Sequence, residues 1–396
     1  MIILDFYGPG SGVGRCTIEI LRELESMAVP TLLAGHFYET SRLQQCLSSP
    51  KHIRFQSLDR PRYRVAHLQV SLYRRFFRRQ GCFSDVMLRL ARQTGDALMP
   101  PEQRKILVNF PQVMPSPERE RGFSVFIHDL NWLHYPGNFR DPALTDRWCR
   151  GWVERADRVL TNSEFTRREV IEHYLCPPEK VVAAPLAPHV ETTALEPSIA
   201  SRTLARLGLV SGKFFLFPNG WGVHKGYDTL TDAMELADGI DPVVVTCGSP
   251  ARDNPWLTPG INRARASLVA RWKQLAAQKR LIITDSLPEP EIQALRLHCK
   301  AFVLPSRFEG FGFPLVEAVY NHRPAIVSDI PAHREILDRY PRYRLAQLFP
   351  AGSVEKLAAE LQRPVATSPV PDGWSESINA VWSWRQTVAK ILQAIA

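Results

Sequence analysis

Two parts of this chain have the same order of features, and this repetition limits the possible folds more than any other property of the sequence. The first part opens with an apolar stretch, Ile2–Tyr7, followed by a glycine-rich turn and a helical pattern over Cys16–Leu24. The second opens with Phe214–Pro218, continues through a loop with glycines and enters a helix at Tyr227. A strand, a turn and a helix in this order are typical of parallel sheets covered by helices on both faces. We therefore expect an α/β chain with two doubly wound, Rossmann-like domains.

Length and composition fit this expectation. A chain of 396 residues suits two or three domains, and 45% hydrophobic with 22% charged residues is typical of a soluble globular protein. No apolar run reaches the 18 residues of a spanning helix, and the first residues, MIILDFYGPGSGVGR, do not have the pattern of a signal peptide. The seven cysteines are scattered without a CxxC pair, so we expect reduced thiols in a cytoplasmic protein and no zinc site.

The net charge of +9 is concentrated in one segment, residues 51–92, which holds eleven Lys and Arg against two Asp. Within it, VSLYRRFFRRQGCF alternates arginine pairs with aromatic residues. A helix with this pattern would suit an anionic membrane surface, but it would equally suit packing of its aromatics into the domain. Nucleic acid is less favoured because no nucleic-acid-binding motif accompanies the basic residues. The residues expected to face the membrane are Arg74, Arg75, Phe76, Phe77, Arg78 and Arg79.

The stretch Pro305–Glu317, PSRFEGFGFPLVE, carries the strongest chemical signal. It follows the predicted strand Ala301–Leu304, and Pro314 is well placed to open a helix. Glu309 would then lie in the loop and Glu317 in the first turns of the helix. The glycines allow close backbone approach, and a helix start favours an anionic ligand such as a diphosphate. The alternative is an ordinary strand, turn and helix without a ligand.

Two further positions have both a functional and a structural interpretation. Lys225 lies between a predicted strand and a helix, in NGWGVHKGYD, where a lysine binds an anion or is simply solvated. His128 follows the predicted strand of Val125–Asp129, at the end where open α/β sheets bind ligands, although a lone histidine is more often structural. The early glycines do not give GxGxxG, which disfavours a nicotinamide enzyme and leaves a turn that approaches a ligand or only needs positive φ.

Other segments bear on the fold. In residues 156–174 we expect a strand ending at Thr161, a cap at Asn162 or Ser163 and a helix over Phe165–Tyr174. Residues 188–202 have few large apolar side chains and are interpreted as a linker.

Three phrases of the sequence, PSRFEGFGFPLVEA, FIHDLNWLHYP and HKG, resemble the retaining glycosyltransferases of family 4, in particular a mannosyltransferase-like group. The resemblance implies a GT-B fold, in which two doubly wound Rossmann-like domains face a cleft. It places an N-terminal acceptor-binding domain at residues 1–190, a donor-binding domain at 191–375 and a helix that crosses back to the N-terminal domain at 376–396. It covers the whole chain but is loose over residues 30–120.

The family pattern also implies site roles at matching positions. Lys225 would neutralise the donor diphosphate, Glu309 with the Phe311–Gly312 backbone would hold the sugar, and Glu317 would bind the ribose. His128 would contact the sugar, so that His128, Glu309 and Lys225 form the catalytic set. The donor-binding residues would be Lys225, Glu309, Gly310, Phe311, Gly312, Phe313 and Glu317, with Gly10, Gly12 and Gly14 on the acceptor side.

Two of the places where the chain departs from the family lie in the lysine turn and at the end of the helix that follows the glutamate motif. Relatives often have an arginine a few residues before the lysine, where this chain has Asn219 and His224. Relatives usually have glycine at the position of His322, and we expect Asn321 to take the left-handed conformation in its place. The first departure leaves open how a second positive contact reaches the diphosphate.

From the resemblance we expect a retaining, metal-independent hexosyltransferase without a cofactor and without a metal site, since no DxD pair is present. We expect transfer of mannose from GDP-mannose to a lipid-linked saccharide in surface polysaccharide or glycolipid synthesis. The protein would then be cytoplasmic and peripherally bound to an anionic membrane, with no nucleic-acid partner. A GT-B phosphorylase, a nucleotide-sugar epimerase and a non-catalytic polyanion- or membrane-binding protein remain the alternatives.

Overall fold

The protein is represented by a computed structural model, and its contacts divide the chain into two compact units. Unit 1 comprises residues 1–130, 141–186 and 383–396, and unit 2 comprises residues 131–140 and 187–382. The domain boundaries expected at residues 190 and 375 stay predictions. The structure describes residues 1–5, 12–35, 43–47, 49–57, 82–100, 104–188, 195–219, 222–246, 259–284 and 287–396.

Unit 1 contains a seven-stranded parallel sheet in the order β3-β2-β1-β4-β5-β6-β7. Apart from the more polar edge strand β3, its strands are short, largely apolar runs, as expected where helices cover both faces of a sheet. The strand order reverses between β1 and β4, and open sheets of this kind bind ligands at the carboxyl ends of the strands beside such a reversal. The strands are β1 (Ile2–Asp5), β2 (Thr31–Gly35), β3 (Ile53–Ser57), β4 (Ile106–Asn109), β5 (Ser124–Ile127), β6 (Val159–Thr161) and β7 (Val181–Ala183).

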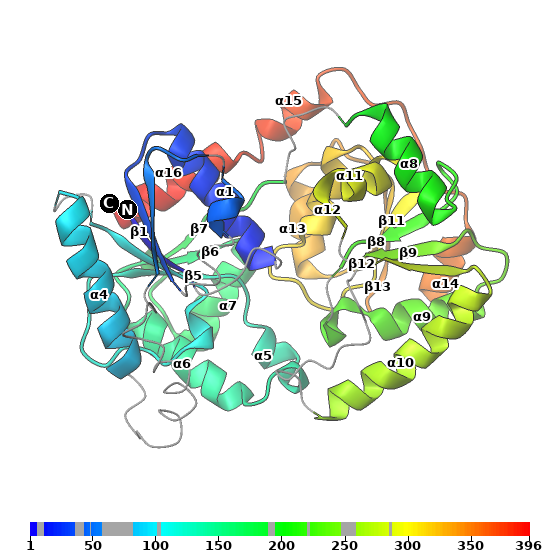
Figure 1. Cartoon of the computed structure of the whole chain (residues 1–396). Helices are drawn as coiled ribbons and strands as arrows, with labels where there is room; N and C mark the ends of the chain where they lie inside the picture. The colour runs from blue at the N-terminus through cyan, green and yellow to red at the C-terminus, as the bar shows by residue number, and fades with distance from the viewer. Residues whose placement is uncertain are drawn as a thin grey trace. The chain divides into compact units, whose positions relative to one another are not determined.

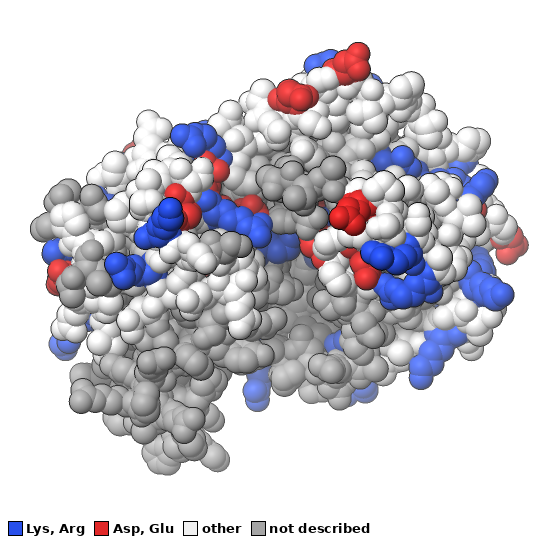
Figure 2. All heavy atoms as spheres, turned by 45° about the horizontal axis from the view of Figure 1, so that its top comes forward, with Lys and Arg blue, Asp and Glu red and all other residues white. Residues whose placement is uncertain are grey.

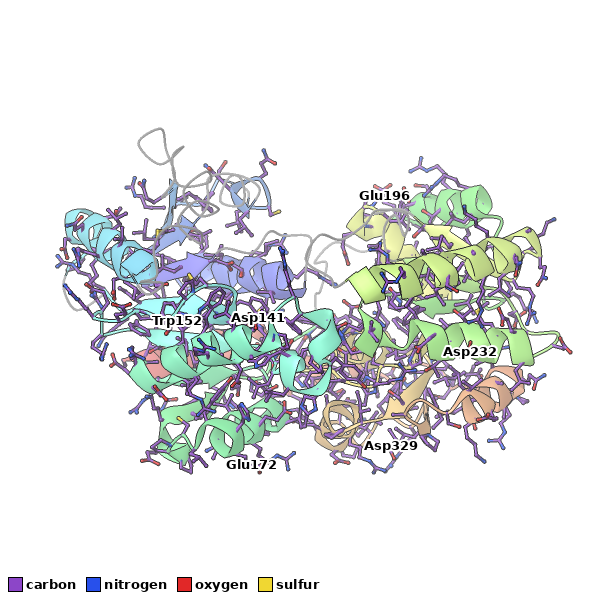
Figure 3. All side chains as sticks on the ribbon, turned by 90° about the horizontal axis from the view of Figure 1, so that it is seen from below. Asp141, Trp152, Glu172, Glu196, Asp232 and Asp329 are labelled. Atoms are coloured by element: carbon purple, nitrogen blue, oxygen red, sulfur yellow. The ribbon has the colours of Figure 1, made fainter. Side chains whose placement is uncertain are left out.

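Helices cover both faces of this sheet. Figure 1 shows α1 and the C-terminal α16 together on one face, and α4 and α6 on the other. Trp152 of α6, labelled in Figure 3, is fully buried and donates its indole N–H to the Met114 carbonyl at 3.1 Å. Ser163 caps α7 by accepting from the Thr166 N–H at 3.0 Å, as predicted. The helices of unit 1 for which the structure gives bounds are α1 (Gly12–Ser26), α4 (Cys82–Leu98), α6 (Pro142–Arg155), α7 (Glu164–Tyr174) and α16 (Trp384–Ile395), with 3-10 turns at Pro111–Val113 and Pro178–Lys180.

Unit 2 repeats the same topology with six parallel strands in the order β10-β9-β8-β11-β12-β13. Here the order reverses between β8 and β11. The expectation of two doubly wound α/β sheets is therefore confirmed. The strands are β8 (Phe215–Phe217), β9 (Val243–Thr246), β10 (Leu281–Thr284), β11 (Ala301–Leu304), β12 (Ala325–Asp329) and β13 (Ala346–Pro350).

The helices of unit 2 form two layers. Figure 1 shows α9, α10 and α14 on one face of the sheet and α8, α11 and α12 on the other. Trp272 of α10 lies in the buried cluster under the first layer. Arg271 pairs at 2.5 Å with Asp232 of α9, which is labelled in Figure 3. The helices are α5 (Asn131–His134), α8 (Pro197–Leu207), α9 (Tyr227–Leu236), α10 (Pro259–Ala277), α11 (Glu289–His298), α12 (Phe313–Tyr320), α13 (Pro331–Arg339), α14 (Val354–Gln362) and α15 (Trp374–Asn379), with 3-10 turns at Pro136–Asn138 and Val223–Lys225.

Three local expectations are wrong. The interpretation of residues 188–202 as a linker fails from Pro197 onward, because α8 begins there and packs on α11. The glycine-rich turn is shorter than expected, since Gly12 and Gly14 already lie in α1, where Gly14 is buried. His322 itself takes the left-handed conformation, at φ 49°, while Asn321 stays at φ −80°.

The side chain of His322 accounts for this last difference. The imidazole is buried, and its ring packs edge-on against Trp374, with the ring centroids 4.3 Å apart. This contact stabilises a backbone conformation that a histidine seldom adopts.

The basic segment falls mainly outside the described residues. Arg74, Arg75, Phe76, Phe77, Arg78 and Arg79, together with the helix predicted around them, lie there, as does Gly10. On the face drawn in Figure 2, basic and acidic side chains of the described residues are interspersed. No helix in the described ranges is both long and apolar enough to span a bilayer.

Candidate functional site

The turn that carries Lys225 is joined to the loop after β11. The 3-10 turn Val223–Lys225 follows β8, and its His224 carbonyl accepts a hydrogen bond from the Arg307 N–H at 2.7 Å. Gly226 ends the turn at φ 73°, and a Cβ atom there would lie 2.1 Å from the Pro305 carbonyl oxygen. Only glycine satisfies both conditions. The two segments that the sequence marks as functional thus meet at the carboxyl ends of β8 and β11.

An ion pair connects these segments. The Lys225 Nζ lies 2.6 Å from Glu309 Oε2, and the Ser306 hydroxyl donates to Glu309 Oε1 at 2.7 Å. Burial alone would raise the pKa of Glu309, but the Lys225 ammonium and neighbouring groups outweigh it, so this pKa lies below its usual range. The Lys225 side chain remains 19% exposed, which leaves its ammonium able to reach a ligand.

Two neutral histidines lie beside the pair. Burial, with the charge of Lys225, lowers the pKa of His224 to about 3, and burial also lowers the pKa of His333. His333 Nδ1 donates to the Ser328 carbonyl at 2.8 Å. His333 was not predicted as a site residue, because no local sequence pattern marks its position in α13. At neutral pH neither imidazole supplies the positive charge that the missing arginine would bring.

The short segment Asn131–Asn138 supports the Lys225 turn. The side-chain amides of Asn131 and Asn138 approach His224 Nδ1 at 3.2 and 3.0 Å. An amide nitrogen can only donate, so Nδ1 accepts and the neutral ring carries its proton on Nε2. His134, to which the sequence gave no role, stacks on Phe308 with ring centroids 4.4 Å apart. Residues 131–140 are therefore part of unit 2 although both flanking segments belong to unit 1.

The start of α12 has the form expected from the motif. Pro314 lies in the first turn, and Gly312 precedes the helix at φ 100°. A Cβ atom on Gly312 would lie 3.2 Å from Ile336 and 3.4 Å from the His333 ring. Phe311 and Phe313 pack edge to face at 5.3 Å. The helix therefore begins within the same short loop, Pro305–Gly312, that carries Glu309, and its dipole favours an anion there.

Glu317 is fully buried and has a cationic partner that the sequence did not reveal. Arg296 of α11 approaches both carboxylate oxygens of Glu317 at 3.1 Å. The two residues are each only 2% exposed. Arg296 also pairs with Glu289 and approaches Gln293 at 3.3 Å. A glutamate in so apolar a helix requires such a partner, so the sequence could have indicated that a cation is needed but not which residue supplies it.

The remaining predicted residues lie in unit 1. His128 follows β5 directly, as predicted, and its Nε2 lies 2.7 Å from Asn109 Oδ1. Burial lowers the pKa of His128 to about 3. Within the described residues, no group of three or more His, Cys, Asp or Glu side chains is arranged to hold a metal ion.

Taken together, unit 2 places a partly exposed cation, a buried carboxylate and a helix start at the strand reversal of its sheet. This arrangement can bind an anion and a polyhydroxylated group side by side. The structure brings Lys225, Glu309 and the Gly310–Phe313 loop together in one unit, and the roles of these residues stay predictions.

Comparison with known proteins gives a consistent result. Residues 207–377 match the family model described as glycosyl transferases group 1. Over 221 residues the chain is 22% identical to the O-antigen chain mannosyltransferase RfbU of Salmonella typhimurium, covering 55% of each chain. Over 271 residues it is 26% identical to the MMP alpha-(1->4)-mannosyltransferase of Mycolicibacterium hassiacum, covering 64% of this chain and 59% of that protein. The chain thus spans between half and two thirds of the length of these relatives.

The fold has solved counterparts over its whole length. The structure of HepE of Anabaena in complex with UDP and glucose aligns with a TM-score of 0.70 at 16% identity, covering 99% of this chain and 98% of that one. With the two doubly wound sheets, this likeness identifies the fold as GT-B.

Proposed function

Because residues 207–377 match the family model described as glycosyl transferases group 1, we propose that this protein transfers a hexose from a nucleotide diphosphate sugar to a saccharide acceptor. The observation that carries the proposal is the Lys225–Glu309 pair, held at 2.6 Å where the strand order of unit 2 reverses. A diphosphate leaving group gains negative charge as the glycosidic bond breaks. A fixed ammonium beside it stabilises that charge in the transition state.

The ion pair also explains how the site can remain stable without a donor. Lys225 is compensated by Glu309, so neither charge is left unpaired in the buried loop. A bound diphosphate would share the ammonium with Glu309, and the start of α12 would supply further positive potential. The positive potential at the start of α12 thus adds to the charge of Lys225 and would replace the second positive contact that an arginine provides in relatives.

The other residue roles follow from the same proposal. Glu309 and the backbone of Phe311 and Gly312 would hold the sugar, and Glu317 would bind the ribose. Each carboxylate oxygen can accept more than one hydrogen bond, so the pairing of Glu317 with Arg296 is compatible with a bound hydroxyl. His128 would contact the transferred sugar, and the glycines at the start of α1 would lie on the acceptor side.

We propose that transfer retains the configuration at the anomeric carbon and uses no metal ion. The bond from the anomeric carbon to the leaving phosphate breaks while the acceptor oxygen attacks the same face. The leaving phosphate takes the proton of the acceptor hydroxyl, so atoms and charges balance without a carboxylate base. Loss of activity with a chelator and its recovery with Mg²⁺ would contradict the metal-free route.

For the donor we propose GDP-mannose, supported by the names of RfbU and the M. hassiacum enzyme, both mannosyltransferases. UDP-sugars are the competing donors, because HepE binds UDP. For the acceptor we propose a lipid-linked saccharide used in surface polysaccharide synthesis, reached by a cytoplasmic protein bound peripherally to an anionic membrane. The basic segment supports this location.

A panel of nucleotide sugars tests the proposal. We expect GDP-mannose to raise the melting temperature more than UDP- or ADP-sugars, because binding to the folded state alone stabilises it. With a saccharide acceptor, the product linkage should retain the donor configuration in proton NMR spectra. The proposal fails if no nucleotide sugar binds, or if phosphorolysis or epimerisation of the donor is observed without transfer.

A further inference from the structure

A chain of buried polar groups runs across the strand reversal of unit 1. Asp5 ends β1, Asn109 ends β4 and His128 follows β5, so the three lie at the carboxyl ends of adjacent strands. Thr17 approaches them from α1. All four side chains are buried, with exposed fractions of 5% or less. Buried polar groups in this number are unusual unless each is satisfied.

The hydrogen bonds determine which atoms of the network donate and which accept. Thr17 donates its hydroxyl proton to Asp5 Oδ2, and Asn109 Nδ2 lies 2.9 Å from Asp5 Oδ2 and 2.9 Å from Thr17 Oγ1. The Asn109 amide nitrogen therefore donates toward the neighbouring oxygens of Asp5 and Thr17, which lie together on one side of Nδ2. The carbonyl oxygen of Asn109 is left to face His128 Nε2 at 2.7 Å.

The opposite orientation of the Asn109 amide is excluded by Asp5. A flipped amide would place Oδ1 against the Asp5 carboxylate, oxygen against oxygen at 2.9 Å. Since Oδ1 of Asn109 can only accept, His128 Nε2 must donate. The neutral ring thus carries its single proton on Nε2, and Nδ1 keeps a lone pair.

The surroundings of the ring hold it in place. Phe126 stacks on the imidazole with centroids 4.6 Å apart, and Phe110 lies 6.0 Å away on a tilted plane. Burial lowers the pKa of His128 to about 3, so the ring is neutral at physiological pH and a weak base. An imidazole of this kind accepts a hydrogen bond and does not take up the proton.

We propose that Asn109, anchored by Asp5 and Thr17, is a positioning residue that fixes the Nε2-protonated form of His128 and directs its Nδ1 lone pair toward a hydroxyl group of the sugar substrate. The proposal rests on the proposed sugar transfer. Asn109 thereby acts on the substrate only through His128. His128 acts as a hydrogen-bond acceptor in its neutral, Nε2-protonated form.

The test combines NMR with kinetics on the full chain. In ¹⁵N-histidine-labelled protein at pH 7, we expect a slowly exchanging ring N–H of His128 at Nε2, assigned by its absence in His128→Ala. Asn109→Leu should abolish this protected proton and lower kcat at least about tenfold. Asn109→Asp should restore both, because closely spaced carboxyl groups share a proton and an acceptor oxygen remains toward Nε2.

A double-mutant cycle separates positioning from a purely structural role. If Asn109 acts through His128, Asn109→Leu should lower kcat no further in the His128→Ala background. Ser163→Ala, which removes the α7 cap in the same unit, serves as a control for stability and should leave the His128 resonance and kcat unchanged.

Three results would overturn the inference: a His128 proton on Nδ1, wild-type turnover in Asn109→Leu, or additive losses in the cycle. The NMR measurement needs no substrate. If wild-type protein transfers no sugar while the Nε2 proton is found, the proposed function fails and the positioning of His128 stands.

Discussion

At the scale of single residues, the positive charge of Lys225 has two roles, and both can be tested with the substitution Lys225→Ala. It compensates buried Glu309, and we propose that it neutralises the leaving diphosphate. In Lys225→Ala we expect kcat to fall roughly 100-fold, the magnitude typical of losing one preorganised electrostatic contact. The pKa of Glu309 should rise, because burial then acts without its main opposing charge.

Lys300→Ala is a matched control for this experiment. Lys300 forms an ion pair of similar length with Asp241, at 2.7 Å, in the same unit but outside the candidate site. Its removal should cost little activity. Equal losses in the two variants would indicate a general effect on stability and would remove Lys225 from the diphosphate site.

The buried imidazole of His128 predicts a pH dependence of stability. Its pKa is about 3 in the folded protein, against 6.5 for an ordinary histidine, so between these two pH values the unfolded chain binds more protons. Stability should therefore fall with decreasing pH, by about 2 kcal/mol between pH 6.5 and pH 5 for this group. Chemical denaturation at several pH values should show a shallower slope in His128→Gln. An unchanged slope would mean that His128 is protonated in the fold.

Sequence reasoning found some site residues and missed others for a physical reason. Lys225 and Glu309 lie in short phrases with local signatures, so they could be predicted. Arg296 and Asn109 could not, because their importance depends on partners more than 15 positions away, Glu317 and His128. Such pairs are set by the order of strands and helices, which no local pattern encodes.

At the scale of elements, the turn after β8 depends on one glycine. In Gly226→Ala the added Cβ would meet the Pro305 carbonyl at 2.1 Å and would also strain a backbone at φ 73°. We expect a loss of about 3 kcal/mol or more in the free energy of unfolding, with weaker nucleotide binding because the Lys225 turn must separate from the loop.

Gly239→Ala is a control that separates the steric contact in Gly226→Ala from the cost of a positive φ. Gly239 has a similar φ of 66° in the same unit, yet nothing lies within 4 Å of its added Cβ. This variant should lose only the conformational cost, about 1–2 kcal/mol, and should bind nucleotide normally. Similar denaturation midpoints for the two variants would contradict the close contact of turn and loop.

The segment around α5 makes a separate prediction. Asn138→Ala removes the amide that binds His224 at 3.0 Å, and we expect about 1 kcal/mol less stability and a severalfold weaker affinity for nucleotide sugar by calorimetry. Asp141→Ala removes the cap of α6 only three residues later and should cost similar stability without changing affinity. Unchanged affinity in Asn138→Ala would show that the segment does not hold the Lys225 turn.

Elements with strong apolar runs were predictable, whereas those that depend on tertiary contacts were not. The strands β5, β8 and β11 and the start of α12 appear where their sequences predict them. Helix α8 was missed because it offers few large apolar residues and is stabilised by packing on α11. The left-handed His322 was missed because its cost is offset by Trp374, more than 50 residues away.

At the scale of the whole molecule, the net charge of +9 is concentrated in the basic segment, residues 51–92. We therefore predict that the protein binds anionic membranes through this segment. Replacing four arginines there with serine should weaken binding to vesicles with anionic lipid by more than roughly 100-fold, since each contributes on the order of 1 kcal/mol. The binding should also weaken with salt. The four positions are Arg74, Arg75, Arg78 and Arg79.

A control with equal charge loss distinguishes a local site from total charge. Four exposed basic residues of unit 2 can be replaced by serine in the same way. Vesicle sedimentation should then show nearly wild-type binding, whereas an equal loss in both variants would refute a dedicated membrane segment. The control positions are Lys273, Lys279, Arg342 and Arg344.

The division of the chain into units has a consequence for its synthesis. Unit 1 begins with β1 but includes residues 383–396, while unit 2 takes residues 131–140 from within the span of unit 1. A ribosome makes the chain from its N-terminus, so the first unit to emerge is the last to be completed, when α16 reaches α1. Until then the α16-binding surface of α1 stays uncovered, and a nascent chain paused before residue 383 would present that surface to chaperones.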